Sequence, residues 1–123
     1  EGVAFIVRRN IEVIEGLGVS VNEVRALGGG ARSRVWKQME ADIAGRPVVT
    51  TANEEAATLG AAILAGKAVG IYASVEEAAE RMIQIKDRFE PNPKNRSVYD
   101  DTFGMYIKLY EALCPLFEMR QAN

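Results

Sequence analysis

Three consecutive glycines, Gly28 to Gly30, stand where a short apolar run ends and a helical pattern begins. Glycine adopts backbone conformations closed to other residues and lets backbone N–H groups approach a ligand without a side chain in the way. The helix that follows adds unpaired N–H groups and the positive end of its dipole, which together favour an anion such as phosphate. Arg32 and Arg34 lie shortly after the glycines and could add positive charge. The segment is therefore a candidate phosphate-binding loop.

The glycines alone fit a second interpretation equally well, because a tight turn after a strand also needs room for the backbone. The dinucleotide pattern G-x-G-x-x-G fails because Ser33 occupies the position of its third glycine. The Gly-Lys-Ser/Thr ending of a P-loop is also absent from the sequence. Rossmann and P-loop functions are therefore disfavoured.

No catalytic residue is predicted in this chain. It contains no histidine, which excludes a Ser-His-Asp triad, a Cys-His pair and the usual histidine-containing metal sites. Among the carboxylates considered, Asp42 is expected on the polar side of a helix and Glu54 at a helix start, so solvation and the helix dipole explain both. Trp36 could stack on a base, but its spacing with Met39 and Ile43 favours core packing.

The first half of the chain alternates helices and strands. Apolar spacing predicts a helix over Val3–Leu17 and a strand over Val21–Leu27. A second helix, with Val35, Trp36, Met39 and Ile43 on one face, should end near Gly45 because Pro47 cannot continue it. A second strand is predicted over residues 47–51. This order predicts parallel strands joined by a right-handed crossover, and hence an α/β fold with helices flanking the strands.

The second half reads as mainly helical. Glu54 and Glu55 precede a helix over Ala56–Ala65, whose small residues 60–62 predict close packing against the sheet. A capping box at residues 74–77 should begin a helix that runs to about Lys86. An extended linker is predicted over residues 88–94, followed by a helix with an aromatic stripe that Pro115 should end or kink. The stripe contains Tyr99, Phe103, Tyr106 and Tyr110, and is predicted to be core.

The composition restricts the kinds of partner and the cellular compartment that are expected for this chain. The 15 Lys and Arg nearly balance the 17 Asp and Glu, so the net charge of -2 predicts binding to neither nucleic acid nor an anionic membrane. No apolar stretch approaches the roughly 20 residues that span a bilayer. The single cysteine, Cys114, has no partner within the chain and indicates a reducing compartment, so a cytoplasmic location is expected.

A sheet of two strands is too small to be complete, so we expect missing neighbours. Residues 1–123 are then predicted to be a portion of a larger protein. The exposed half-sheet also predicts self-association of the isolated chain, with a homodimer as one form. The other interpretation left open is a non-catalytic interaction module that recruits another chain through an exposed sheet edge.

Three ordered blocks in the sequence resemble the C-terminal domain of FGGY-family carbohydrate kinases, and within that family the xylulokinases. The blocks are Glu1–Phe5, the segment from Gly28 to Val48 that contains the glycine loop, and the segment from Glu55 to Ala62. The resemblance weakens after about Ile71. It implies an actin-like, ribonuclease-H-like ATPase fold, whose two domains close around ATP and a sugar, with Mg2+ assisting phosphoryl transfer.

The resemblance also assigns roles to the loop that begins at Gly28. It implies that Gly29, Gly30 and Ala31 lie beside the phosphates or ribose of ATP, while Ser33 and Arg34 lie nearer the adenosine. The catalytic aspartate, the sugar-binding residues and a first phosphate-binding segment are implied to lie upstream of this chain. The resemblance thus predicts that residues 1–123 are the C-terminal nucleotide-binding portion of a larger two-domain sugar kinase. The isolated chain would hold only a nucleotide half-site, and the predicted substrate of the whole enzyme is a ketopentose such as xylulose.

Overall fold

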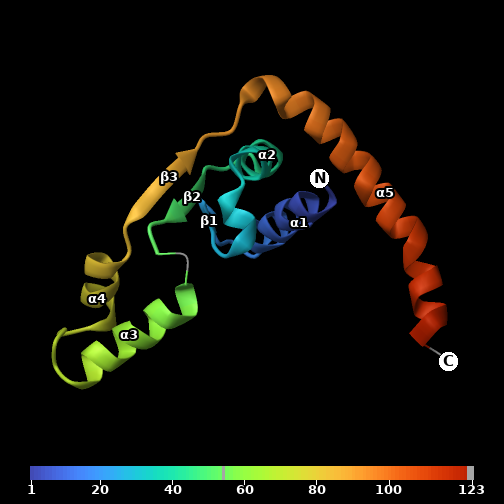
Figure 1. Cartoon of the computed structure of the whole chain (residues 1–123). Coiled ribbons are helices and arrows are strands. Elements are labelled where there is room, and N and C mark those ends of the chain that lie inside the picture. Colours follow the sequence, from blue (N-terminus) through green and yellow to red (C-terminus); the bar gives the residue numbers. More distant parts are fainter. Residues whose placement is uncertain (54, 122–123) are drawn as a thin grey trace.

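The computed structural model describes residues 1–53 and 55–121, which form a mixed sheet and helices (Figure 1). The strands are β1 (Val24–Ala26), β2 (Val48–Thr51) and β3 (Ile85–Phe89). The α-helices are α1 (Gly2–Gly16), α2 (Arg34–Ala44), α3 (Ala56–Ala68), α4 (Val75–Met82) and α5 (Arg96–Gln121). Two short 3-10 helices, η1 (Gly29–Arg32) and η2 (Pro93–Asn95), precede α2 and α5.

The sheet has the order β1-β2-β3, with the fully buried β2 in the centre. β1 and β2 are parallel, with Val24 opposite Val48, as predicted. β3 runs antiparallel to β2, with Thr50 opposite Asp87. The prediction of a helix to Lys86 and a linker from residue 88 is therefore wrong. A buried central strand must pair its backbone on both edges, and β3 satisfies the second edge of β2.

The ends of α2 follow from two residues. The Ser33 side chain is the N-cap, and its Oγ accepts a hydrogen bond from the Trp36 backbone N–H at 3.3 Å. The helix ends at Gly45, as predicted, and this glycine adopts the left-handed conformation, at φ +62°. The glycine loop therefore enters a helix whose axis and first turn are fixed.

The main core lies between α1, α2 and α5, which Figure 1 shows stacked on one side of the sheet. Phe5 packs its ring against Phe103 and Tyr106, with centroids 5.8 and 5.4 Å apart. These contacts confirm most of the predicted aromatic stripe. Tyr110 is the exception, because it is 40% exposed and lies under the guanidinium of Arg9.

The predicted apolar face of α2 is shorter than expected. Ile43 is fully buried and Met39 packs against the same cluster, but Val35 is 81% exposed. Trp36 is half-buried and lies outside this cluster. Its indole instead lies near Gly30, so the predicted core role of Trp36 is wrong.

Asp42 is buried, contrary to the prediction that it lies on a solvated face. Its Oδ1 accepts hydrogen bonds from Gln38 Nε2 and the Asn92 backbone N–H at 2.8 and 2.7 Å, and its Oδ2 accepts one from Asn95 Nδ2 at 2.7 Å. Those donors compensate the loss of water. Asp42 thus ties α2 to the segment that leads from β3 into α5.

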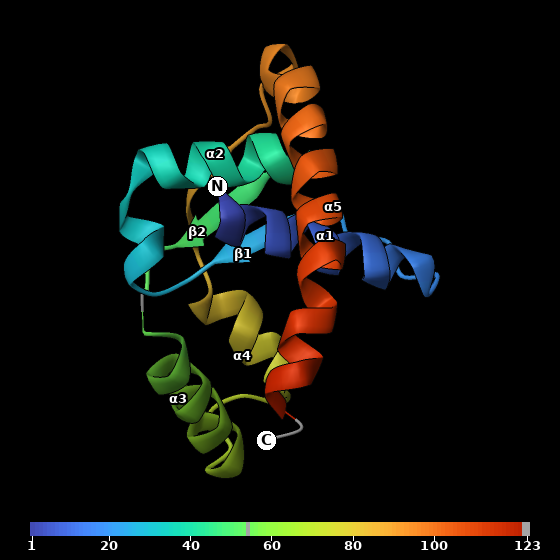
Figure 2. The same cartoon turned by 90° about the vertical axis from the view of Figure 1, so that its right-hand side faces the viewer.

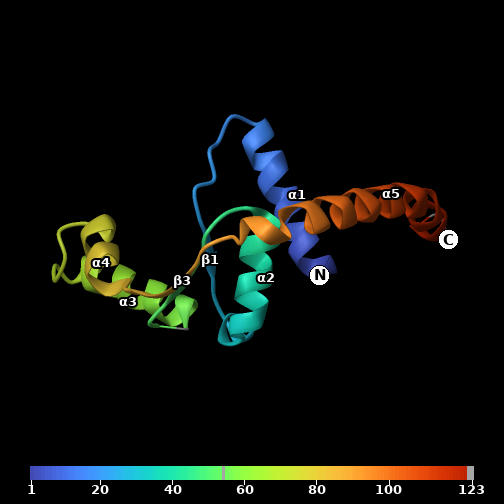
Figure 3. The same ribbon diagram turned by 90° about the horizontal axis from the view of Figure 1, so that it is seen from above.

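α3 and α4 pack against each other and lie away from the main core (Figures 2 and 3). The predicted close packing at residues 60–62 is wrong, because a Cβ added at Gly60 would meet nothing within 4 Å. Close approach occurs instead at Gly66, where an added Cβ would lie 2.8 Å from the Tyr72 ring. The prediction placed close contact against the sheet, whereas α3 packs mainly on α4.

The structure confirms part of the cap predicted for α4 but, among the described residues, shows no side-chain cap at the start of α3. Ser74 Oγ accepts a hydrogen bond from the Glu77 backbone N–H at 3.0 Å, which confirms half of the capping box. The Glu77 carboxylate accepts its bond from the Ala73 N–H, one residue earlier than expected. Glu55 is the N-cap of α3 but makes no side-chain cap hydrogen bond, and Glu54 lies outside the described residues.

α5 continues through Pro115 to Gln121, so this proline does not end the helix. Proline removes one backbone donor, and the turns on either side continue the helix. Within residues 1–53 and 55–121, no helix combines the length and the apolar character needed to cross a membrane.

The connection between α1 and β1 is held by an ion pair that should make stability depend on pH. Arg46 donates through Nη2 to Glu15 Oε1 at 2.8 Å and through Nε to the Val21 carbonyl at 2.9 Å. The hydrogen bond from Arg46 lowers the pKa of Glu15 below its ordinary value of 4.5. A carboxyl whose pKa is lower in the folded state stabilises the fold above its unfolded pKa, and this stabilisation is lost as the pH falls through the folded pKa.

Glu15→Gln is therefore expected to destabilise the protein at about pH 7 and to do so less at about pH 3, because the ion pair is lost as the pH falls through the lowered pKa of the wild-type carboxyl. Urea denaturation of both proteins at the two pH values measures the difference. A stability gap that stays constant with pH would contradict the ion-pair explanation. Glu12→Gln, on the same helix, serves as a comparison with a more exposed carboxylate, which pairs with Arg8 at 3.1 Å.

Candidate functional site

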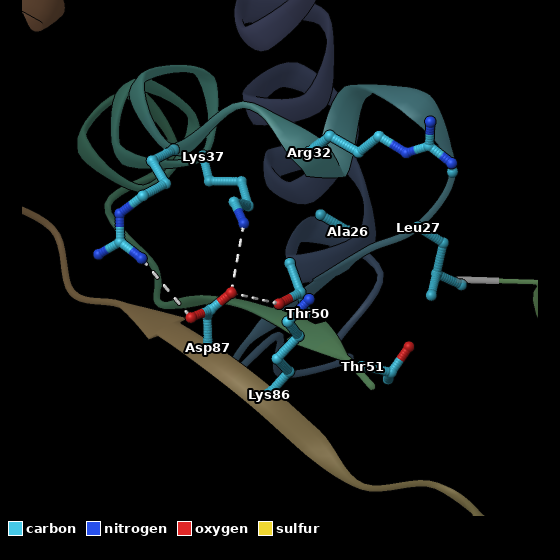
Figure 4. Close-up of a pocket in the computed structure, with 10 residues that line it drawn as sticks. Ala26, Leu27, Arg32, Lys37, Thr50, Thr51, Lys86 and Asp87 are labelled. Carbon is cyan, nitrogen blue, oxygen red and sulfur yellow. Dashed lines mark hydrogen bonds and ion pairs between the residues drawn. The ribbon is translucent and has the colours of Figure 1, made fainter. Parts of the chain in front are cut away.

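A pocket of about 330 Å³ opens at the carboxyl ends of the parallel strands β1 and β2 (Figure 4). In open α/β sheets, ligands bind in the crevice outside this edge. β1 and the glycine loop contribute Ala26, Leu27 and Gly28, and β2 contributes Thr50 and Thr51. The remaining lining residues come from η1, α2 and β3: Arg32, Arg34, Lys37, Lys86 and Asp87.

The pocket lining is strongly basic, although the chain as a whole carries a net charge of -2. Four of its residues are Arg or Lys and one is Asp, so the lining carries a net charge of +3 by this count. Clustered cations in a concave site raise the local concentration of anionic ligands. Arginine also binds phosphate oxygens through paired N–H donors. The pocket is therefore suited to a phosphorylated ligand.

Lys37 provides a fixed positive charge at the back of the pocket. The residue is only 3% exposed, and its Nζ lies 3.6 Å from Asp87 Oδ2 and 4.7 Å from the centroid of the Phe89 ring. A buried ammonium needs such a partner because it has lost its water. The carboxylate and the aromatic face together hold Lys37 in place.

Asp87 is the meeting point of three side chains in Figure 4. Besides Lys37, its Oδ2 accepts a hydrogen bond from the Thr50 hydroxyl at 3.3 Å, and its Oδ1 lies 3.6 Å from Arg34 Nη1. The Arg34 side chain is 76% exposed, so this pairing leaves its guanidinium accessible to a ligand.

The structure brings two of the predicted site residues to the pocket wall. Gly28 and Arg34 line it, and Gly28 has φ +77° and ψ -162°, a conformation that favours glycine. Gly29, Gly30 and Ala31 lie in η1, directly beyond this wall, and Ser33 caps α2. An added Cβ would meet nothing within 4 Å at Gly29, whereas at Gly30 it would lie 3.8 Å from Trp36 Nε1.

The sequence interpretation missed several residues of the pocket. Thr50 and Thr51 could have been found, because the ends of two parallel strands meet at the same edge as the glycine loop. The sequence pattern places Lys86 at the end of a predicted helix and assigns Asp87 to no element. The burial of Lys37 depends on Asp87, which is far away in the sequence, so no local pattern indicates it.

The described residues do not form a metal site of their own. Within residues 1–53 and 55–121, no group of three or more His, Cys, Asp or Glu side chains could hold a metal ion. The carboxylate of Asp87 is already engaged by Lys37, Arg34 and Thr50. These residues therefore do not fit a Mg2+ site within this chain, and Mg2+ remains an expectation from the resemblance.

Comparison with known proteins agrees with the fold. Residues 1–69 match the C-terminal domain of the FGGY family of carbohydrate kinases. The chain belongs to this family. The xylulose kinase of Bacillus subtilis (strain 168) is 37% identical over 110 residues, which cover 89% of this chain and 22% of that protein.

Solved structures place this FGGY chain in the same fold. The xylulose kinase of Rhodospirillum rubrum superimposes with a TM-score of 0.78 at 30% identity, covering 94% of this chain and 24% of that one. A glycerol kinase of Plasmodium falciparum, solved with ADP, superimposes with a TM-score of 0.71 at 22% identity, covering 86% of this chain and 22% of that one. The predicted α/β fold, part of an actin-like, ribonuclease-H-like ATPase domain, is confirmed. The chain spans about a quarter or less of the length of these relatives.

Proposed function

We propose that this FGGY chain supplies part of the ATP site of a sugar kinase. The observation that carries the proposal is the basic pocket beside the glycine loop, at the edge of the sheet where ligands of α/β folds bind. The membership in a family of carbohydrate kinases favours this function over a non-catalytic interaction module. The complete enzyme would transfer the γ-phosphoryl group of ATP to a sugar hydroxyl.

In this proposal the loop residues have distinct roles. Gly29, Gly30 and Ala31 bind beside the phosphates or ribose, and Ser33 and Arg34 lie nearer the adenosine. The four cations of the pocket lining add a positive potential that favours a polyphosphate. Mg2+ would accompany ATP, with its protein ligands in a portion of the enzyme beyond this chain.

The contribution of this chain to the reaction is to bind and orient the phosphoryl donor. Phosphoryl transfer depends mainly on positioning and on stabilisation of the charge on the transferred group. Lys37 is well suited to such a role because its contacts with Asp87 and Phe89 fix the position of its ammonium group before the nucleotide arrives. The catalytic aspartate that activates the sugar hydroxyl, and the sugar site itself, are proposed to lie outside this chain.

A ketopentose such as xylulose is the proposed substrate, because both the curated relative from Bacillus subtilis and the structure from Rhodospirillum rubrum are xylulose kinases. A coupled assay of ADP release with the full-length enzyme and a panel of sugars tests this assignment. The highest kcat/KM is expected with xylulose. A higher value with an aldose or a polyol would show that the ketopentose assignment is wrong. It would not bear on the proposed ATP site.

Gly29→Val tests the nucleotide site directly. A side chain at Gly29 enters open space and the backbone has no positive φ there, so stability should change by less than about 0.5 kcal/mol. The same side chain would stand where the phosphates or ribose approach, so ADP affinity should fall at least about tenfold, equivalent to about 1.4 kcal/mol. Calorimetric titration of the full-length enzyme with Mg-ADP, together with thermal denaturation, measures both quantities.

Gly28→Val is the matched control, because Gly28 has φ +77° and a branched residue is strained there. This variant should lose both stability and affinity. If Gly29→Val also loses both in parallel, the loop is only a structural turn. If it loses neither, the nucleotide does not approach the loop and the proposed site is wrong.

A further inference from the structure

Asp87 is the one acidic residue among the described residues that line the basic pocket. Its carboxylate faces Lys37 and Arg34 at 3.6 Å each and accepts a hydrogen bond from Thr50 at 3.3 Å. The carboxylate thus forms ion pairs with two of the four cations of the pocket lining before any ligand binds. An anion entering this pocket meets both the attraction of the cations and the repulsion of this carboxylate.

The two ion pairs of Asp87 differ in how easily they can be broken. Lys37 is only 4% exposed at its side chain and is held by the Phe89 ring, so it cannot leave Asp87 without a large rearrangement. Arg34 is 76% exposed and lies 5.2 Å above the same ring. Exposed ion pairs contribute little energy, so Arg34 can separate from Asp87 at little cost when a ligand binds.

We propose that Asp87 is an internal counter-ion that weakens the binding of phosphorylated ligands in this pocket and thereby sets the affinity for a nucleoside diphosphate. This inference rests on the proposed nucleotide site. Because the repulsion is Coulombic, it acts across the pocket and needs no direct contact between Asp87 and a phosphate. A kinase must release ADP after each turnover, and a carboxylate among the cations prevents the product from being held too tightly.

The effect of Asp87 depends on the charge of the ligand. Removing the carboxylate should strengthen binding of ADP, which carries a diphosphate, and should leave binding of adenosine unchanged. If Asp87 had a purely structural role, its removal would instead change the affinities for ADP and adenosine alike. The ratio of the two affinities therefore separates an electrostatic role from a loss of local structure.

The test compares Asp87→Asn with the wild type in the full-length enzyme, by calorimetric titration with ADP and with adenosine. ADP is expected to bind about fivefold more tightly to the variant, which corresponds to a partly exposed charge interaction, and adenosine within about twofold of the wild type. The gain for ADP should shrink at high salt, because salt screens the interaction. Glu90→Gln is the matched control, since Glu90 pairs with Arg88 outside the pocket lining.

Two further variants test whether the effect follows the charge at this position. Asp87→Ser retains an oxygen acceptor and should also strengthen ADP binding, whereas Asp87→Glu retains the charge and should bind ADP as the wild type does. Weaker ADP binding in Asp87→Ser, or equal changes for ADP and adenosine, would overturn the proposal. If the wild type binds neither ligand, the proposed nucleotide site itself fails.

Discussion

Phe5→Ala is expected to destabilise the protein by about 3–5 kcal/mol, the usual cost of removing a fully packed aromatic side chain. Phe5 is 3% exposed and its ring contacts Phe103 and Tyr106. Its removal would leave a cavity between α1 and α5, and also remove aromatic contacts that no neighbour can replace. The loss should separate the C-terminal helix from the rest of the fold before the sheet is affected.

The matched control for this variant is Ile6→Ala, on the same helix but 48% exposed, which should cost less than about 1 kcal/mol. Urea denaturation followed by tryptophan fluorescence and circular dichroism measures both changes. Similar losses for Phe5→Ala and Ile6→Ala would show that α1 does not pack on α5 as described.

Asp42→Ala is expected to cost about 3 kcal/mol, because removal of a buried acceptor leaves several donors without partners. The donors are Gln38 Nε2, the Asn92 backbone N–H and Asn95 Nδ2. The variant should also loosen the segment that joins β3 to α5. Asp42 is therefore expected to act on stability and not on the chemical step.

Asp101→Ala is the control, since Asp101 is an exposed carboxylate on α5, and it should change stability by less than about 0.5 kcal/mol. Thermal denaturation measures stability, and hydrogen exchange of residues 90–96 reports the loosening. If Asp42→Ala keeps its stability but loses catalytic activity, the structural role assigned to Asp42 is wrong and a functional one must replace it.

The glycine loop and the helix that follows it were predictable because their signals are local. Ser33 lies at an N-cap position, Gly45 at a C-cap position, and the apolar steps from Met39 to Ile43 match a helical period. The parallel pairing of β1 and β2 followed from the order of elements alone. The family resemblance predicted a nucleotide site at the loop, which the glycines by themselves did not.

β3 and the acidic centre of the pocket were not predictable because their signals are long-range. Only Phe89 is buried among the five residues of β3, so the strand lacks the alternation that identifies a half-buried strand. Burial of Asp42 and of Lys37 requires partners from the segment after residue 85, which reach α2 only when the chain has folded. The basic pocket is likewise invisible in a chain whose net charge is slightly negative.

The pairing of β3 with β2 has a consequence for the order in which the chain folds. Residues 52–84 separate the two strands, so β3 can pair only after this whole segment has closed as a loop, at an entropic cost that local helices do not incur. α3 and α4 form a hairpin of their own within that segment and shorten the distance to be closed. We therefore expect Asp87 to reach the pocket late in folding, after the helices and the glycine loop have formed.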